Sequence, residues 1–170
     1  MENLKRSGFF ASLLTMALII SSCSSTSENK AGSDSDSAVD DNASATSLEL
    51  NGSSDASTAG PLQTVYFEFD STTLSSETKE VLNQNAMWLK GMESVDIQIE
   101  GHADERGGQQ YNLALGERRA KAVKNYLEAL GVKSSRITVI SYGKEKPNAF
   151  GHDESAWSKN RRANFVITAK

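Results

Sequence analysis

The stretch from residue 101 to residue 119 holds the side chains best suited to chemistry in this 170-residue chain. It reads GHADERGGQQYNLALGERR, which predicts the end of a strand, a charged loop and the first turns of a helix. Asp104 falls in the loop and Arg119 on the helix. An aspartate accepts hydrogen bonds from an ammonium group, and a guanidinium suits a carboxylate. With the free N–H groups of the helix start, the pair predicts a clamp for a zwitterion such as an amino-acid head group.

The same residues are also compatible with purely structural roles. Asp104 can hydrogen-bond within its own turn, as loop aspartates often do. Arg119 lies beside the predicted core position Ala120, so we expect it to skirt the buried stripe with its guanidinium near the helix start, where it can pair with a surface acid. Residue types alone leave the clamp and the structural roles open.

Four strands and three helices are predicted around this stretch. Alternating apolar residues and β-formers predict strands at residues 65–69, 95–100, 137–142 and 163–168. Helical spacing and capping residues predict a helix from Ser75 or Ser76 to Leu89, a long helix from about Asn112 to Leu130, and a short helix at residues 153–160. The long helix is expected to bury Leu113, Gly116, Ala120, Val123, Leu127 and Leu130. We therefore expect an α/β (α+β) two-layer sandwich with a four-stranded mixed sheet, two main helices and a short third helix.

Five separated blocks resemble one known family. They are GHADERG, YNLALGERRAKAVKNYL, SYGKEKP, GHDESAW and KNRRA. Their order resembles the OmpA-like domain family, and within it the peptidoglycan-associated lipoproteins, over residues 62–170. The resemblance implies a non-enzymatic domain without a cofactor that binds meso-diaminopimelate in the stem peptide of peptidoglycan. It also implies TolB and other Tol proteins as partners, in the Tol-Pal system that acts in envelope constriction at cell division.

The resemblance also implies which residues bind peptidoglycan. The matching positions are Asp70, Asp104, Leu115, Arg119 and Arg161. Within this set, Asp104 and Arg119 bind the ligand, Leu115 is the apolar contact and Arg161 supports the site. Gly108 and Gln109 depart from the threonine and proline of close relatives, which affects the tip of the loop. Because diaminopimelate ends in an amino-acid head group that lysine lacks, the clamp predicts a preference for diaminopimelate-type over lysine-type peptidoglycan.

Residues 1–22 have the order of a secretory signal peptide. A basic start precedes a mostly apolar run at residues 9–20, small residues follow, and then Cys23. The run Ile20-Ser21-Ser22-Cys23 resembles a bacterial lipobox, which implies lipidation of Cys23 and anchoring in the outer membrane of a Gram-negative bacterium, with the domain in the periplasm. The alternative is an ordinary signal peptide that ends near a cysteine.

Residues 23–61 are expected to form the lipidated N-terminus and a disordered linker ahead of a domain at residues 62–170. Residues 24–61 contain no aromatic residue, seven acids and one base. Such a segment buries too little apolar surface to offset its chain entropy, and its like charges favour extension.

Several other functions find little support. A formal charge of -4 argues against nucleic acid as a partner. His102 and Asp104 with His152 and its acidic neighbours are weak evidence for a metal site, so no metal is expected. The sequence contains no GxSxG or HExxH motif. A hydrolase that uses Asp104 as a base, and a protein-binding lipoprotein whose pocket is vestigial, remain as alternatives. Trp157 is expected in the core, and the alternative is that it anchors a partner.

Overall fold

A computed structural model describes residues 48–170. The signal peptide at residues 1–22, Cys23 and the linker as far as residue 47 lie outside the described residues. None of the helices among residues 48–170 combines the length and the apolar character needed to span a membrane.

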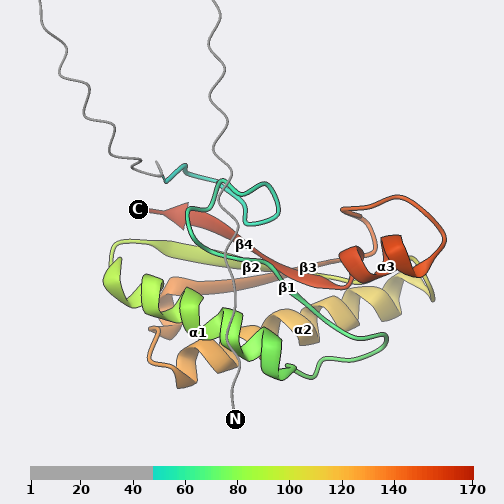
Figure 1. Cartoon of the computed structure of the whole chain (residues 1–170), viewed down its shortest axis with the longest axis horizontal. Coiled ribbons are helices and arrows are strands. Elements are labelled where there is room, and N and C mark those ends of the chain that lie inside the picture. The colour runs from blue at the N-terminus through green and yellow to red at the C-terminus, as the bar shows by residue number, and fades with distance from the viewer. Residues whose placement is uncertain (1–47) are drawn as a thin grey trace, which may run out of the picture. The chain divides into compact units, whose positions relative to one another are not determined.

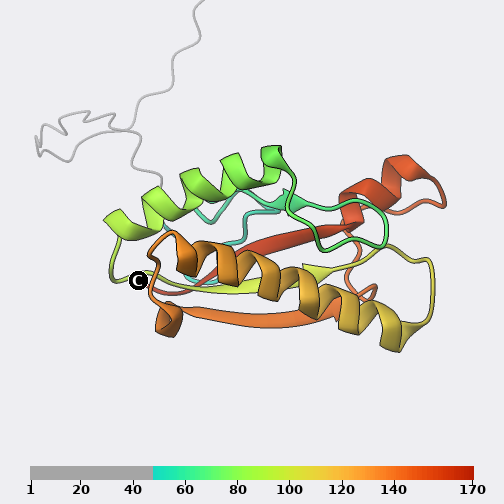
Figure 2. The same ribbon diagram turned by 90° about the horizontal axis from the view of Figure 1, so that it is seen from below.

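The core of the fold is one four-stranded sheet in the order β1-β4-β2-β3. The strands are β1 (Val65–Tyr66), β2 (Asp96–His102), β3 (Ile137–Gly143) and β4 (Arg162–Ala169). Strands β2 and β3 are parallel, and β4 pairs antiparallel with both β1 and β2. Helices α1 (Ser76–Gly91) and α2 (Gln109–Ala129) lie on one face of the sheet, as Figures 1 and 2 both show. With the short α3 (Glu154–Asn160), this confirms the predicted fold class.

Strand β2 lies between β4 and β3. Apolar and polar residues alternate along it, so that one of its faces is buried. Val95, Ile97 and Ile99 are almost fully buried, whereas Asp96 and Gln98 on the other face are only partly covered. The apolar row belongs to one core cluster with helix residues such as Leu82 and Val123. The same cluster includes Leu89, Ala120, Leu127, Phe165 and Ile167. The strand thus delivers the chain to the position of Asp104, two residues beyond its end.

Helix α1 begins and ends close to the predicted positions. The Ser75 hydroxyl accepts a hydrogen bond from the backbone N–H of Thr78 at 3.0 Å, which makes Ser75 the N-cap. Leu82, Ala86 and Leu89 are buried, as the spacing predicts.

Helix α2 begins earlier than predicted. It buries four of the six predicted residues, together with Asn112, Leu115 and Arg119. Its N-cap is Gly108, and no side chain caps it. Asn112 was expected near the start, but it lies buried inside the helix, where its amide donates to the carbonyl of Arg106 at 2.8 Å. Leu113 is 47% exposed, whereas Leu115 and Arg119 are buried. Leu115 and Arg119 therefore lie on the buried face of the helix, and Leu113 lies outside it.

Two glycines bring α2 against β2. A Cβ atom on Gly101 would lie 1.9 Å from the carbonyl oxygen of Gly116. No larger residue fits at this crossing, so the helix and strand approach each other by their backbones. At its other end α2 stops at Gly131, whose φ is 95° and whose N–H bonds to the Glu128 carbonyl.

Strand β1 is shorter than the predicted strand at residues 65–69. The Phe67 N–H bonds to the carbonyl of Arg161, just outside β4. Beyond it the chain leaves the sheet, and Asp70 has a φ of 50°. The residues after Tyr66 therefore form a loop beside the start of α2 rather than the end of a strand.

Residues before 62, the predicted start of the domain, also pack against the sheet. Residues 51–54 pair with the part of β4 that β1 does not reach: Asn51 and Ser54 donate to the carbonyls of Ile167 and Phe165, both at 2.8 Å. Ala59 is fully buried, and Asp55 pairs with Arg162 at 2.6 Å. Backbone pairing and polar contacts hold this segment, which its polar composition does not reveal.

Candidate functional site

A cavity of about 210 Å³ lies between the loop after β1, the loop after β2 and the start of α2. Among its lining residues are four of the five predicted site residues: Asp70, Asp104, Leu115 and Arg119. The fifth, Arg161, contacts Asp104 from behind, with its Nη1 atom 3.5 Å from the Asp104 Oδ2 atom. At about 30 Å³ per water molecule, the cavity has room for a small polar head group.

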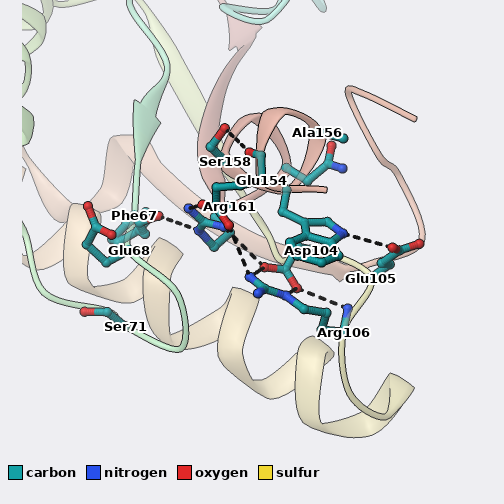
Figure 3. Close-up of polar contacts among 12 residues, drawn as sticks. Phe67, Glu68, Ser71, Asp104, Glu105, Arg106, Glu154, Ala156, Ser158 and Arg161 are labelled. Atoms are coloured by element: carbon teal, nitrogen blue, oxygen red, sulfur yellow. Dashed lines mark hydrogen bonds and ion pairs between the residues drawn. The ribbon is translucent and has the colours of Figure 1, made fainter. Parts of the chain in front are cut away.

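Asp104 presents a buried, ionised carboxylate. Asp104 is 4% exposed. Arg106 donates to it three times: from its backbone N–H and Nε to Oδ1, both at 3.1 Å, and from Nη2 to Oδ2 at 2.6 Å (Figure 3). Burial by itself raises the pKa of Asp104, but the hydrogen bonds and charge of Arg106 lower it below its usual value. The expected turn role of Asp104 is therefore present, together with a full ion pair.

Arg119 is fully buried, and it does not skirt the helix surface as predicted. Its guanidinium donates to the backbone carbonyls of Ser71 at 2.9 Å, His102 at 2.8 Å and Glu68 at 2.9 Å. Because α2 starts at Gln109, Arg119 lies about 15 Å along the helix, well beyond its first turn. Burial, and then the charge of Arg161, lower the pKa of Arg119 to about 10, so it stays charged at neutral pH.

The guanidinium of Arg119 has donors to spare. Three of its five N–H groups meet backbone carbonyls, and within residues 48–170 the other two have no acceptor. Arg119 is one of the residues that line the cavity with Asp104. The lining of the cavity therefore includes an ionised carboxylate and a charged guanidinium, groups that suit a cation and an anion respectively.

Asp70 and Tyr111 form a polar contact at the cavity rim. The Tyr111 hydroxyl donates to the Asp70 carboxylate, and both side chains are exposed. This hydrogen bond, and the charge of Asp70, raise the pKa of Tyr111. Tyr111 was not among the predicted residues; its position in the first turn of α2 is the signal that points to the cavity.

Arg106 is the main residue that sequence reasoning missed. Its guanidinium lies between two aromatic rings, 3.9 Å from the centre of Phe69 and 4.0 Å from the ring of Trp157. The available signal is its place two residues after Asp104, which suits an aspartate-centred turn. Trp157 is half-buried and was expected in the core, but it lies outside the core cluster and its ring packs on Arg106.

The loop that carries Arg106 is held from several sides. The Glu105 carboxylate accepts hydrogen bonds from Trp157 Nε1 at 2.9 Å and is 2.7 Å from His152 Nδ1. Lys144 Nζ donates to the carbonyls of Glu105 and Gly107. The hydrogen bond between Glu105 and His152 lowers the pKa of the carboxyl and raises the pKa of the imidazole. The loop backbone is thus fixed, while the Arg106 side chain stays 30% exposed.

Histidines and acids are not gathered into a metal site in this part of the chain. Among residues 48–170, no group of three or more His, Cys, Asp or Glu side chains is placed to hold a metal ion. His102 is buried in the sheet and stacks on Tyr142, whereas the His152 side chain is 89% exposed.

Comparison with known proteins places similar chains in one group. The model of the OmpA family matches residues 66–161. The peptidoglycan-associated lipoprotein of Pseudomonas aeruginosa is 45% identical over 165 residues, which cover 95% of this chain and 97% of that protein. That of Pasteurella multocida is 49% identical over 100 residues, 59% of this chain and 67% of that protein.

Solved structures show the same similarity. The crystal structure of the peptidoglycan-associated lipoprotein from Burkholderia pseudomallei has 47% sequence identity and a TM-score of 0.60, covering 61% of this chain and 88% of that one. The C-terminal domain of Helicobacter pylori MotB has 21% identity and a TM-score of 0.60, covering 64% and 85%. At that identity the second match supports the fold alone.

Proposed function

The chain belongs to the OmpA family, and from this membership and the charged cavity we propose that it is a non-enzymatic lipoprotein whose domain binds peptidoglycan noncovalently. The names of the relatives and the resemblance of the motif blocks support this proposal. The single observation that carries it is the joint presence of Asp104 and Arg119, both buried and both charged, in the lining of one small cavity.

The ligand we propose is the free head group of meso-diaminopimelate in a stem peptide. Its ammonium group binds the Asp104 carboxylate, and its carboxylate binds the spare N–H groups of Arg119. Leu115 contacts the aliphatic part of the ligand, Asp70 binds from the rim, and Arg161 keeps the Asp104 carboxylate ionised. Because a buried polar group loses much when its partner is missing, a lysine side chain, which lacks the carboxylate, binds less tightly.

In the same proposal, lipid on Cys23 anchors the chain in the outer membrane, after removal of a signal peptide at residues 1–22. The segment that follows lets the domain reach peptidoglycan in the periplasm. TolB and other Tol proteins are its protein partners, in the Tol-Pal system of envelope integrity and cell division.

A catalytic role for Asp104 finds less support. A general base works best with a pKa near the working pH. Although burial raises the pKa of Asp104, the hydrogen bonds and charge of Arg106 hold it below its usual value. This is the environment of a binding carboxylate. Incubation of the protein with purified peptidoglycan tests the point, and release of soluble fragments contradicts the binding role.

Calorimetric titration of the full-length protein in detergent tests the ligand. One stem peptide contains meso-diaminopimelate, and its twin contains lysine at that position. We expect the first peptide to bind at least about tenfold more tightly, the equivalent of one charged hydrogen-bonding pair. Asp104→Asn should abolish binding. Asp96→Asn, at the start of the strand that leads to Asp104, is the matched control and should bind normally. Equal binding of both peptides, or no binding by folded protein, contradicts the proposal.

A further inference from the structure

The guanidinium of Arg106 sits where a bound cation is expected. It forms a two-point contact with the Asp104 carboxylate and lies between the rings of Phe69 and Trp157 at about equal distances, 3.9 Å and 4.0 Å. The negative faces of aromatic rings attract cations, and a carboxylate supplies the opposite charge. The three side chains therefore form a seat for a cation, and the cation that occupies it in this structure belongs to the protein.

Besides Arg106, a second arginine, Arg161, lies close to the Asp104 carboxylate. Arg161 is 4% exposed, and its Nη1 atom has no hydrogen-bond partner within residues 48–170, although it lies 3.5 Å from the Asp104 Oδ2 atom. This buried donor can strengthen its contact with the carboxylate once the oxygen is released. Arg161 thus remains beside the Asp104 carboxylate when the Arg106 side chain is absent.

Arg106 is able to leave by side-chain rotation alone. Its carbonyl is held by Asn112, and Lys144 holds the carbonyls on either side, so the backbone stays in place. Its side chain is 30% exposed, which gives the guanidinium a path to solvent. A Cβ atom on the nearby Gly108 would meet nothing within 4 Å, so the loop surface outside the seat is open.

We propose that Phe69, Trp157 and Asp104 form a cation seat that Arg106 fills in the ligand-free protein, and that the ammonium group of the ligand displaces Arg106 from it. This inference rests on the proposed function, since it names how that ligand enters the site. It makes Arg106 an internal competitor, and the two aromatic rings determinants of selectivity for a cation. The apparent affinity is lowered by the fraction of molecules in which Arg106 occupies the seat.

The experiment compares wild-type protein with Arg106→Gln and Arg118→Gln. Arg118 is an exposed arginine on α2, adjacent in sequence to Arg119, and serves as the matched control. Each full-length protein is titrated with the diaminopimelate stem peptide and with the same peptide acetylated on its free side-chain amine. We expect Arg106→Gln to bind the free amine about tenfold more tightly than wild type, because the competitor is gone. Arg118→Gln should match wild type, and the acetylated peptide should bind none of the three.

The outcomes separate this inference from the proposed function. If wild type binds and Arg106→Gln, still folded by its melting curve, binds equally or more weakly, the seat proposal is overturned and the proposed function stands. If Arg106→Gln alone binds, the seat is supported in its strongest form, and if neither binds, both proposals fall. Tight binding of the acetylated peptide also overturns the seat.

A second measurement does not depend on a change in affinity. The Nε–H signal of Arg106 in an NMR spectrum reports its ion pair and the two rings around it. We expect saturation with the free-amine peptide to move this signal to the position of a solvated arginine. An unchanged signal in the saturated complex means that Arg106 stays in the seat, which refutes the proposal.

Discussion

Replacing Arg119 with methionine tests whether this arginine stabilises the fold around the cavity in addition to lining it. Methionine keeps an unbranched chain of similar length and removes only the charged head. The guanidinium bonds the carbonyls of Glu68 and Ser71 in one loop and of His102 at the end of β2. These segments lead to Asp70 and Asp104. The variant should therefore lose stability in addition to any loss of ligand.

The size of the effect follows from the burial of the three contacts. A hydrogen bond from a charged donor contributes about 1.5–3 kcal/mol. The bond to His102 is buried and the bonds to Glu68 and Ser71 are only partly buried, so together they contribute about 4–6 kcal/mol. Burial of the charge offsets part of this, as the lowered pKa of Arg119 indicates. We expect a net loss of about 3 kcal/mol, or about 10 °C in Tm for a domain of this size.

Urea unfolding of the full-length protein, followed by tryptophan fluorescence, measures the loss. Arg118→Met is the control, because Arg118 is exposed and its substitution should change the free energy of unfolding by less than about 0.5 kcal/mol. If Arg119→Met is no less stable than Arg118→Met, the three carbonyl contacts contribute nothing, and the reasoning that assigns Arg119 a structural role fails.

Three further predictions concern the fold and the loop. Gly116→Ala should cost about 2–3 kcal/mol in a thermal melt, since its Cβ would lie 2.7 Å from a backbone oxygen of β2; a melt equal to that of wild type contradicts the close packing. The pKa of His152, raised by Glu105, should fall toward its usual value in Glu105→Gln when followed by NMR. Because that pKa is raised, the pair stabilises the fold below about pH 6.5 for as long as the Glu105 carboxyl is ionised, and it is lost as pH rises through the folded-state value of His152; an unchanged titration refutes the contact. Asp55→Ala leaves the buried Arg162 without its carboxylate and should cost about 3 kcal/mol in urea unfolding; no loss means that residues 48–61 contribute little to the fold.

The parts of the fold that sequence reasoning predicted are those set by local patterns. The alternation of Val95, Ile97 and Ile99 identifies β2 because one face must be buried. Ser75 identifies the start of α1 because a hydroxyl satisfies its first N–H groups. The pairing of residues 51–54 with β4 has no such pattern. It depends on an open strand edge more than 100 positions away in the chain, which no local window contains.

Four of the residues that the sequence singled out, Asp70, Asp104, Leu115 and Arg119, line one cavity, but the way in which they are held was not predicted. The position of Arg119 was wrong because helical spacing treats arginine as a surface residue. Burial of an arginine becomes acceptable only when several carbonyls converge on it, and their convergence is a tertiary feature.

A second buried arginine clarifies what distinguishes Arg119. Arg136 donates to the carbonyls of Leu89, Met92 and Val95, and so joins the end of α1 to the start of β2 by the same chemistry. Arg119 differs from Arg136 because it lines the same cavity as Asp104. Its structural bonds fix the guanidinium before a ligand arrives, which reduces the entropy lost on binding. Weaker ligand binding by an Arg119 variant can therefore have two causes, the missing contact with the ligand and a displaced loop. Asp104→Asn and Arg106→Gln leave the three carbonyl bonds intact, so they give the cleaner tests of recognition.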